Sequence, residues 1–164
     1  MPTLAYSGPQ TVRANALFHA TLTVTLAETV APGGRIAIAL RHFTDMALPQ
    51  LHDPAQENYL EVTFSRPGIT WQLETELDWY RHPWNQGFDL LITDGTLTPG
   101  DCVELRLGGT RGFRCQSYVE AHCPWRVGVR STADAEWQVQ PVESLPGFAV
   151  VGNAPVRIKV SLPQ

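Results

Sequence analysis

A two-residue alternation of apolar and polar side chains recurs along most of the chain and constrains its fold more than any other feature. It is clearest in residues 87–107, where the polar positions are occupied by side chains such as Asp89, Glu104 and Arg106. The apolar positions in this stretch are Phe88, Leu90, Ile92, Val103, Leu105 and Leu107. A period of two is typical of a strand that buries one face, and a register slip of one residue would expose the whole apolar set.

Glycine and proline punctuate the alternation at short intervals. Pro32-Gly33-Gly34, Arg66-Pro67-Gly68 and Pro99-Gly100-Asp101 each separate two alternating stretches. Proline fixes φ and glycine accepts positive φ, so these tripeptides predict tight turns. We therefore expect residues 18–26 and 36–40 to form a hairpin around the first of them.

These patterns predict an all-β protein, an antiparallel β-sandwich of about ten to twelve strands, with a partly closed Greek-key barrel as the alternative. No stretch has a helical period of 3.6 residues. The expected strands lie within 18–26, 36–40, 60–64, 69–77, 88–93, 103–107, 113–119, 125–129, 137–139, 148–150 and 156–162.

Size and charge limit the possible functions. The chain has 164 residues, which suits one domain spanning 1–164, and a formal net charge of −4. Nucleic acids and anionic membranes select concentrated basic surfaces, so neither is an expected partner. Three cysteines without a C-x-x-C pair, and an N-terminus without a signal-peptide pattern, favour a soluble cytoplasmic protein.

Two irregular stretches, 42–58 and 79–86, interrupt the alternation. Long connections of this kind in compact domains are often functional. If every connection from Phe18 onward reverses the chain, both stretches emerge at one end of the sandwich together with 108–112 and 131–135. The tight turns then emerge at the other end, and the two irregular stretches are neighbours.

The candidate ligand- or interface-binding residues lie on these two stretches. They are Gln50, His52, Asp53, Trp79, Tyr80, Arg81, His82 and Trp84. The aromatic side chains among them could stack on sugar rings, or they could cover an edge of the core or dock another domain. The second interpretation is favoured.

No catalytic residue, metal site or cofactor is predicted. Asp45, His52, Asp53 and His82 carry metal-ligating groups, but they lack any diagnostic ligand spacing. Glu74 and Glu76 lie two residues apart on one strand, where a solvated polar face is the simpler interpretation than paired catalytic carboxylates. Cys115 shares the parity of Phe113 and Val119, which indicates a buried thiol.

Several segments together resemble one protein family. They are PGGRIAIALR, LPQLHDPAQENYLEV, TDGTLTPGDCVELRLGG, GFRCQSYVE and PGFAVVGNAPVRIKVSLP, which span most of residues 15–163. They are similar to the N-terminal β-rich region of the bacterial domain-of-unknown-function family thirty-six-oh-four. Proteins of that family also carry a region similar to PHP-type metallohydrolases. The chain has no His-x-His element, so no metal ligand is carried over.

The resemblance implies that the chain is the N-terminal accessory domain of a longer, hydrolase-like protein. The first hypothesis is a non-catalytic interaction domain whose partner is an adjoining or separate catalytic domain of unknown substrate. A carbohydrate- or small-ligand-binding module is the alternative, and an independent metal-dependent hydrolase is the second alternative. By the first hypothesis the chain alone is not an enzyme.

Overall fold

The computed structural model describes residues 1–41, 44–75, 83–84 and 86–153. Within these residues the protein consists of strands and one short 3₁₀ turn, η1 (Val142–Ser144). The described part has more strands than the alternation predicts because β1, β2 and β11 have no counterpart among the expected strands, and the expected strand 18–26 is divided into β3 and β4. The strands are β1 (Thr3–Ser7), β2 (Thr11–Arg13), β3 (Leu17–Phe18), β4 (Ala20–Thr25), β5 (Arg35–Leu40), β6 (Leu60–Phe64), β7 (Thr70–Glu74), β8 (Gln86–Asp94), β9 (Cys102–Leu107), β10 (Phe113–Arg114), β11 (Glu120–Pro124), β12 (Arg126–Arg130), β13 (Gln138–Val139) and β14 (Gly147–Val151).

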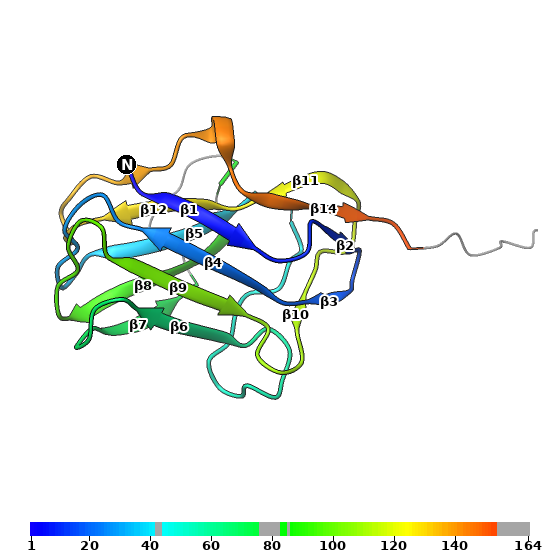
Figure 1. Cartoon of the computed structure of the whole chain (residues 1–164), viewed down its shortest axis with the longest axis horizontal. Helices are drawn as coiled ribbons and strands as arrows, with labels where there is room; N and C mark the ends of the chain where they lie inside the picture. The colour runs from blue at the N-terminus through cyan, green and yellow to red at the C-terminus, as the bar shows by residue number, and fades with distance from the viewer. Residues whose placement is uncertain (42–43, 76–82, 85, 154–164) are drawn as a thin grey trace, which may run out of the picture.

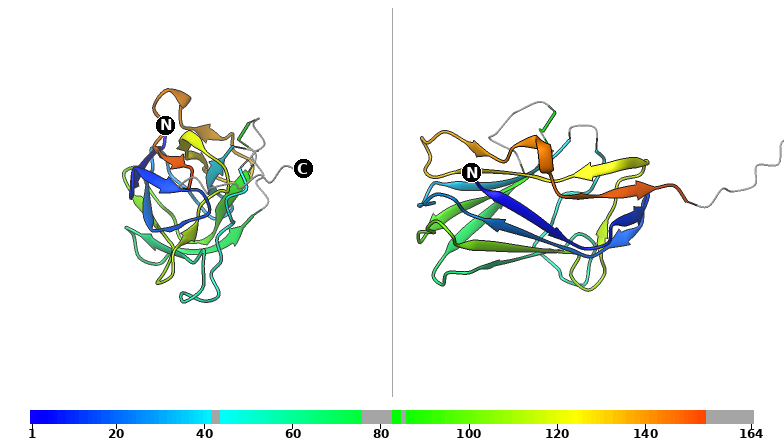
Figure 2. Two further views of the ribbon diagram at one scale, coloured as in Figure 1. Left: turned by 90° about the vertical axis from the view of Figure 1, so that its right-hand side faces the viewer. Right: turned by 45° about the horizontal axis from the view of Figure 1, so that its top comes forward.

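Two main sheets form the β-sandwich (Figure 1). One has four strands in the order β1-β4-β9-β6, and the other has five in the order β13-β12-β5-β8-β7. A three-stranded sheet, β11-β14-β2, and the pair β10-β3 extend the sandwich at one end of its long axis (Figures 1 and 2). None of these sheets closes into a barrel among the described strands, so the sandwich is the correct one of the two expected architectures.

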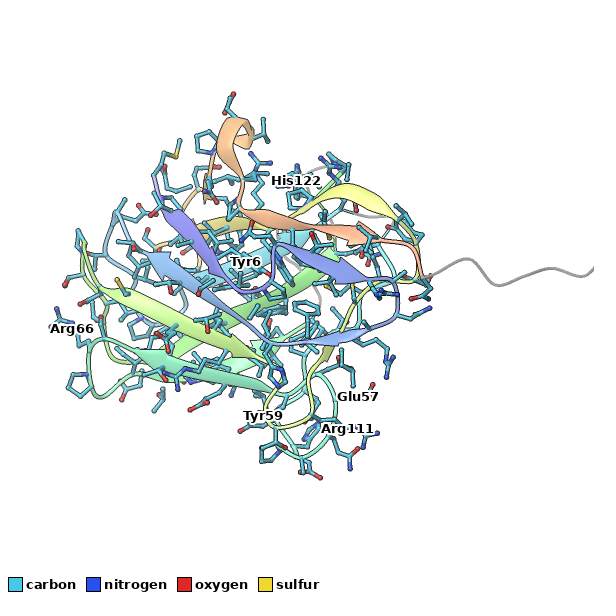
Figure 3. The ribbon with its side chains drawn as sticks, turned by 45° about the vertical axis from the view of Figure 1, so that its right-hand side comes forward. Tyr6, Glu57, Tyr59, Arg66, Arg111 and His122 are labelled. Carbon is cyan, nitrogen blue, oxygen red and sulfur yellow. The ribbon has the colours of Figure 1, made fainter. Side chains whose placement is uncertain are left out.

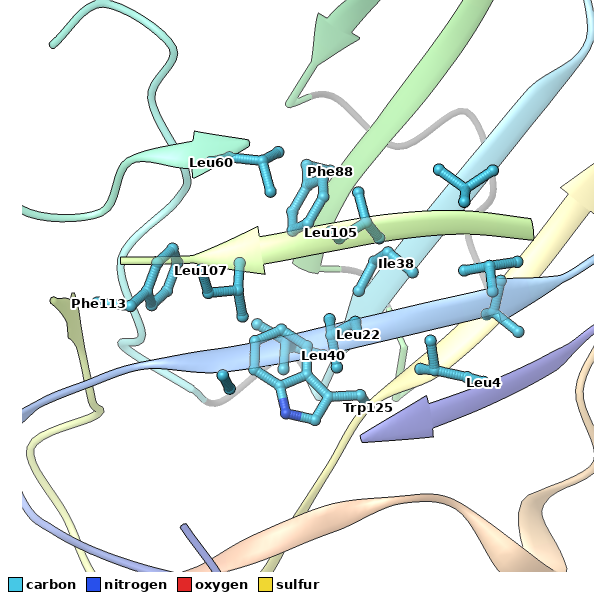
Figure 4. Close-up of a cluster of buried hydrophobic side chains, with 14 of the residues drawn as sticks. Leu4, Leu22, Ile38, Leu40, Leu60, Phe88, Leu105, Leu107, Phe113 and Trp125 are labelled. Carbon is cyan, nitrogen blue, oxygen red and sulfur yellow. The ribbon is translucent and has the colours of Figure 1, made fainter. Parts of the chain in front are cut away.

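The core lies between the inner faces of the two main sheets (Figure 4). Leu22 and Leu105, from β4 and β9, are completely buried, as are Ile38 and Leu90, from β5 and β8. Trp125 is also fully buried, and its indole fills the space beside Leu4, Leu22 and Leu40. The inward side chains are those of the predicted alternation, so the parity of the central strands is confirmed.

The expected hairpin of residues 18–26 and 36–40 is wrong. β4 pairs with β1 and β9 in the four-stranded sheet, whereas β5 pairs with β8 and β12 in the five-stranded sheet. The connecting segment crosses between sheets, because Val30 pairs with Leu97 and the Gly33 amide donates to the Ile92 carbonyl at 2.8 Å. Both strands bury an aliphatic face, and facing each other across the core buries both faces at once.

β1 and β2 were not expected, and one pairing in the described sheets is parallel. β1 alternates only Leu4 and Tyr6, too few residues to predict a strand, and its pairing with β4 defines it. β14 runs parallel to β2 and antiparallel to β11. A parallel pair needs a long connection between its two strands. Here the connection is the rest of the sandwich, because β2 and β14 are far apart in sequence.

The predicted grouping of loops at one end is partly wrong. The 108–112 turn does lie beside the first irregular stretch, because the Thr110 amide donates to the Pro54 carbonyl at 3.0 Å. Residues 131–135 emerge at the opposite end, where the Ala31 amide donates to the Ser131 carbonyl at 2.9 Å. Only Trp125 separates β11 from β12, so the chain changes sheets there without reversing.

A polar cluster joins two tight turns at the end opposite the 108–112 turn. The Asp101 carboxylate accepts hydrogen bonds from Arg66 Nε at 2.9 Å and from the Thr98 amide at 2.7 Å. Figure 3 shows Arg66 far from Glu57, Tyr59 and Arg111, which mark the other end. Hydrogen bonds from Arg66 and Thr98 lower the pKa of Asp101 to about 2.

We expect Asp101→Asn to lower the free energy of unfolding at neutral pH and to have a progressively smaller effect as the pH falls to 2 and below. The folded-state pKa lies below the unfolded value of about 3.9, so the stabilisation is complete above that value and is lost as the pH falls toward 2. Urea denaturation at several pH values measures it. Asp134→Asn, at an exposed position, is the control, and a pH-independent effect of Asp101→Asn would contradict the assignment.

Core packing predicts the effect of truncating one central leucine. Leu105 is completely buried, so we expect Leu105→Ala to lower the free energy of unfolding by about 2–5 kcal/mol. Leu48 is 45% exposed, and Leu48→Ala should change it by less than about 0.5 kcal/mol. Equal losses in urea denaturation of the two variants would contradict the assigned core.

Candidate functional site

The Gln50 side chain fixes the central part of the first irregular stretch. Its Oε1 accepts hydrogen bonds from the amides of His52, at 2.6 Å, and Asp53, at 3.0 Å. Its Nε2 donates to the carbonyls of Asp53, at 2.8 Å, and Glu57, at 3.3 Å. Gln50 also pairs with Tyr59 through the backbone. The predicted interface residue Gln50 therefore holds its own loop in shape.

Contacts with the rest of the sandwich hold both ends of this stretch. Near its start, the Asp45 carboxylate accepts hydrogen bonds from the amide, at 2.8 Å, and the hydroxyl of Ser117. These bonds lower the pKa of Asp45. Near its end, Arg114 makes a bidentate ion pair with Glu57, donating from Nε at 2.8 Å and from Nη2 at 2.5 Å. The loop is thus a fixed surface.

Residues 48–52 separate two hollows in the surface. The first, about 300 Å³, is lined by Leu48, Thr75, Gln86 and Gly87. The second, about 460 Å³, is lined by residues 49–52 and, from β7 and the residue after it, by 71–73 and Thr75. Leu48 of the first irregular stretch therefore lies beside Thr75 and Gln86, the described residues next to the gap 76–82 and residue 85. This position agrees with the prediction that the two irregular stretches are neighbours.

Two leucines of this loop are unusually exposed. Leu48 is 45% exposed and Leu51 is 37% exposed, although both side chains are aliphatic. We call Leu48, Leu51 and the first hollow the docking face. The prediction from sequence missed both leucines, although an LPQL segment inside an otherwise polar loop was a signal that could have found them.

Trp84, one of the candidate binding residues, is buried against a sheet. It is only 5% exposed and packs over Ala37 and Ala39 on the outer face of the five-stranded sheet. The guanidinium groups of Arg126 and Arg41 lie 5.4 and 5.7 Å from the centre of its ring. Trp84 therefore covers the sheet, which agrees with the favoured interpretation of a covering side chain and removes it from a stacking platform for sugars.

The remaining residues of the predicted aromatic site, Trp79, Tyr80, Arg81 and His82, lie outside the described residues. A carbohydrate-binding platform on the second irregular stretch would thus depend on Trp79 and Tyr80 alone.

Asp89 is buried, although the alternation places it on the polar face of its strand. Asp89 is fully buried on the outer face, where Arg35 Nη1 donates to its carboxylate at 2.7 Å and also to Glu74. Burial opposes the charge of Arg35, but the hydrogen bonds to Asp89 and Glu74 outweigh it and raise the pKa of Arg35. Glu74 is therefore an ion-pair partner of Arg35.

The four residues considered for metal binding have separate surroundings. Asp45 bonds to Ser117, whereas Asp53 accepts a hydrogen bond from the Ala55 amide at 2.9 Å, which starts a turn. His52 is exposed, and His82 lies outside the described residues. Among the residues whose positions are described, no three His, Cys, Asp or Glu side chains are grouped to hold a metal ion.

The cysteines are three free thiols. Cys115 is buried, as its parity predicted, and Cys123 is buried as well, whereas Val119, expected on the same side as Cys115, is 63% exposed. The parity fails there because the strand ends at Arg114. Burial raises the pKa of Cys115 to about 11 and that of Cys123 to about 12, so neither is a thiolate nucleophile at neutral pH.

Replacing Gln50 tests whether it fixes the loop. We expect Gln50→Ala to speed hydrogen exchange of the His52 and Asp53 amides by about tenfold or more, because both lose their acceptor. Amide exchange followed by NMR measures the effect. Gln56→Ala, an exposed glutamine in the same loop, should leave these rates unchanged. Equal exchange in both variants would show that the loop is held by other contacts.

No helix of the described residues is long and apolar enough to span a membrane. Comparison of the sequence with protein-family models and with curated proteins found no match.

Proposed function

We propose that this chain is a non-catalytic interaction domain that docks a hydrolase-like catalytic domain through the docking face. The observation that carries the proposal is the exposure of Leu48 and Leu51 on a loop held by side-chain hydrogen bonds. Exposed aliphatic side chains lose their contact with water when a partner covers them, which favours association.

A fixed loop also lowers the cost of binding. The hydrogen bonds of Gln50 and the ion pair between Glu57 and Arg114 order the loop when the chain folds. Association then has less conformational entropy to lose, so more of the free energy of burying the leucines remains as affinity. The hollow beside Leu48 offers a partner side chain a place to insert, as anchor residues in protein interfaces commonly do.

The surroundings of the reactive groups support a non-catalytic role. Asp45 and Asp53 stabilise loop turns, and Asp89 is paired with Arg35 inside the covered face. The buried thiols have raised pKa values. The class of the partner comes from the resemblance to the β-rich region that precedes PHP-type segments, and its substrate is not specified by it.

The test is binding of this chain to a PHP-type catalytic domain encoded beside it or in the same reading frame. We expect a complex by titration calorimetry, and we expect Leu48→Ser and Leu51→Ser each to weaken it by about tenfold, since truncated anchors typically lose 1–2 kcal/mol.

Val142→Ser is the matched control, because Val142 is 53% exposed but lies in η1, away from the docking face. This variant should bind like the original chain. Absence of any complex, or a complex that all three substitutions weaken equally, would rule out docking through this face.

A further inference from the structure

β7 forms one edge of the five-stranded sheet. In the described part of the chain it pairs with β8 alone, so its second side offers backbone amide and carbonyl groups to another strand. Such an edge readily accepts an added strand from another chain. The same side of the sandwich carries β6, the last strand of the four-stranded sheet among the described residues, and its Phe64 ring lies 6.4 Å from that of Trp71.

A groove runs along this edge. It is the second hollow, about 460 Å³, between residues 49–52 and β7. On the inner side of β7, Trp71 and Leu73 are only partly buried and pack against the core. The exposed apolar surface of Leu51 lies on the opposite wall. A strand seated here would gain backbone hydrogen bonds and apolar contacts together.

The other parity of β7 is polar and acidic. Gln72 is exposed, and Glu74 binds Arg35 together with the buried Asp89. The Glu74 carboxylate is partly exposed at this edge, with 34% of its side chain accessible. Opposite charges on neighbouring strands attract, so the edge favours a strand with apolar residues on one parity and basic residues on the other.

The C-terminal segment of the chain has this composition. Residues 156–162, VRIKVSL, alternate four aliphatic residues with Arg157, Lys159 and Ser161. We propose that residues 156–162 of one copy of this chain add as a strand to the β7 edge of a second copy. The aliphatic parity then lies along Trp71 and Leu73, and Arg157 and Lys159 lie on the side of Gln72 and Glu74.

A second copy supplies the segment because of where the described chain ends. β14 ends at one end of the long axis, whereas β7 lies in the other half of the molecule (Figures 1 and 2). Only Ala154 and Pro155 separate Asn153 from Val156, and two residues span at most about 7 Å. Reciprocal exchange between two copies satisfies both edges and gives a closed dimer.

This self-association uses a groove that shares Leu51 with the docking face but does not include Leu48. Leu48 does not line the edge groove, so Leu48→Ser should leave dimerisation unchanged while weakening the docking proposed above. Leu48→Ser therefore distinguishes the two proposals, whereas a substitution of Leu51, which lies in both surfaces, does not.

The test is sedimentation of the full chain over a range of concentrations. We expect a dimer, and we expect Ile158→Pro to raise its dissociation constant by about tenfold or more, because proline removes an amide donor and disfavours a paired strand. Ser161→Ala keeps the backbone donor and is the matched control. A chain that is monomeric at every concentration overturns the proposal.

Charge exchange tests the position of the added strand. Gln72→Lys should weaken the dimer about three- to tenfold, and Arg157→Glu with Lys159→Glu in the same chain should restore it. NMR of the labelled chain with a synthetic peptide of residues 154–164 should shift signals of 49–52 and 71–75. A dimer insensitive to Gln72→Lys overturns pairing at β7, and loss of thermal stability in Ile158→Pro without a change of mass overturns exchange between copies.

Discussion

Burial of two aliphatic sheet faces against each other is the interaction on which the rest of the molecule depends. Leu22 and Leu105 on one sheet, and Ile38 and Leu90 on the other, are removed from water together. This requirement explains why the three expected tight turns, at 32–34, 66–68 and 99–101, lie in connections that cross between sheets instead of closing hairpins. A hairpin would place two aliphatic faces side by side and leave both uncovered.

The outer face of the five-stranded sheet is covered by side chains from other segments. Trp84 and the residues after β12 cover the five-stranded sheet over Ala37 and Ala39. Asp89, which pairs with Ala37 across the sheet, is fully buried, and its carboxylate forms an ion pair with Arg35. An aromatic residue that stands out in the sequence as a ligand platform thus serves as packing. Two exposed leucines lie instead on the 48–52 loop, which polar contacts hold in place.

Much of the scaffold could be predicted from the sequence, whereas the candidate site could be predicted only in part. The all-β class, the parity of β4, β5, β8 and β9 and the burial of Cys115 follow from alternation. Gln50 and Asp53 lie in the predicted loop, but their side chains hold it. Leu48 and Leu51 were missed because periodicity carries no information about an irregular segment.

Which side chains face the core follows from the sequence alone, because a strand has a strict period of two and a slip exposes every aliphatic residue. The sequence could not determine which strands are neighbours, since parity is the same for a hairpin and for two strands in opposite sheets. The contacts in the folded protein show that the chain passes from β11 into β12, in another sheet, without changing direction. Residues 131–135 therefore lie away from the docking face. Those outcomes depend on contacts between residues distant in sequence, which no local pattern records.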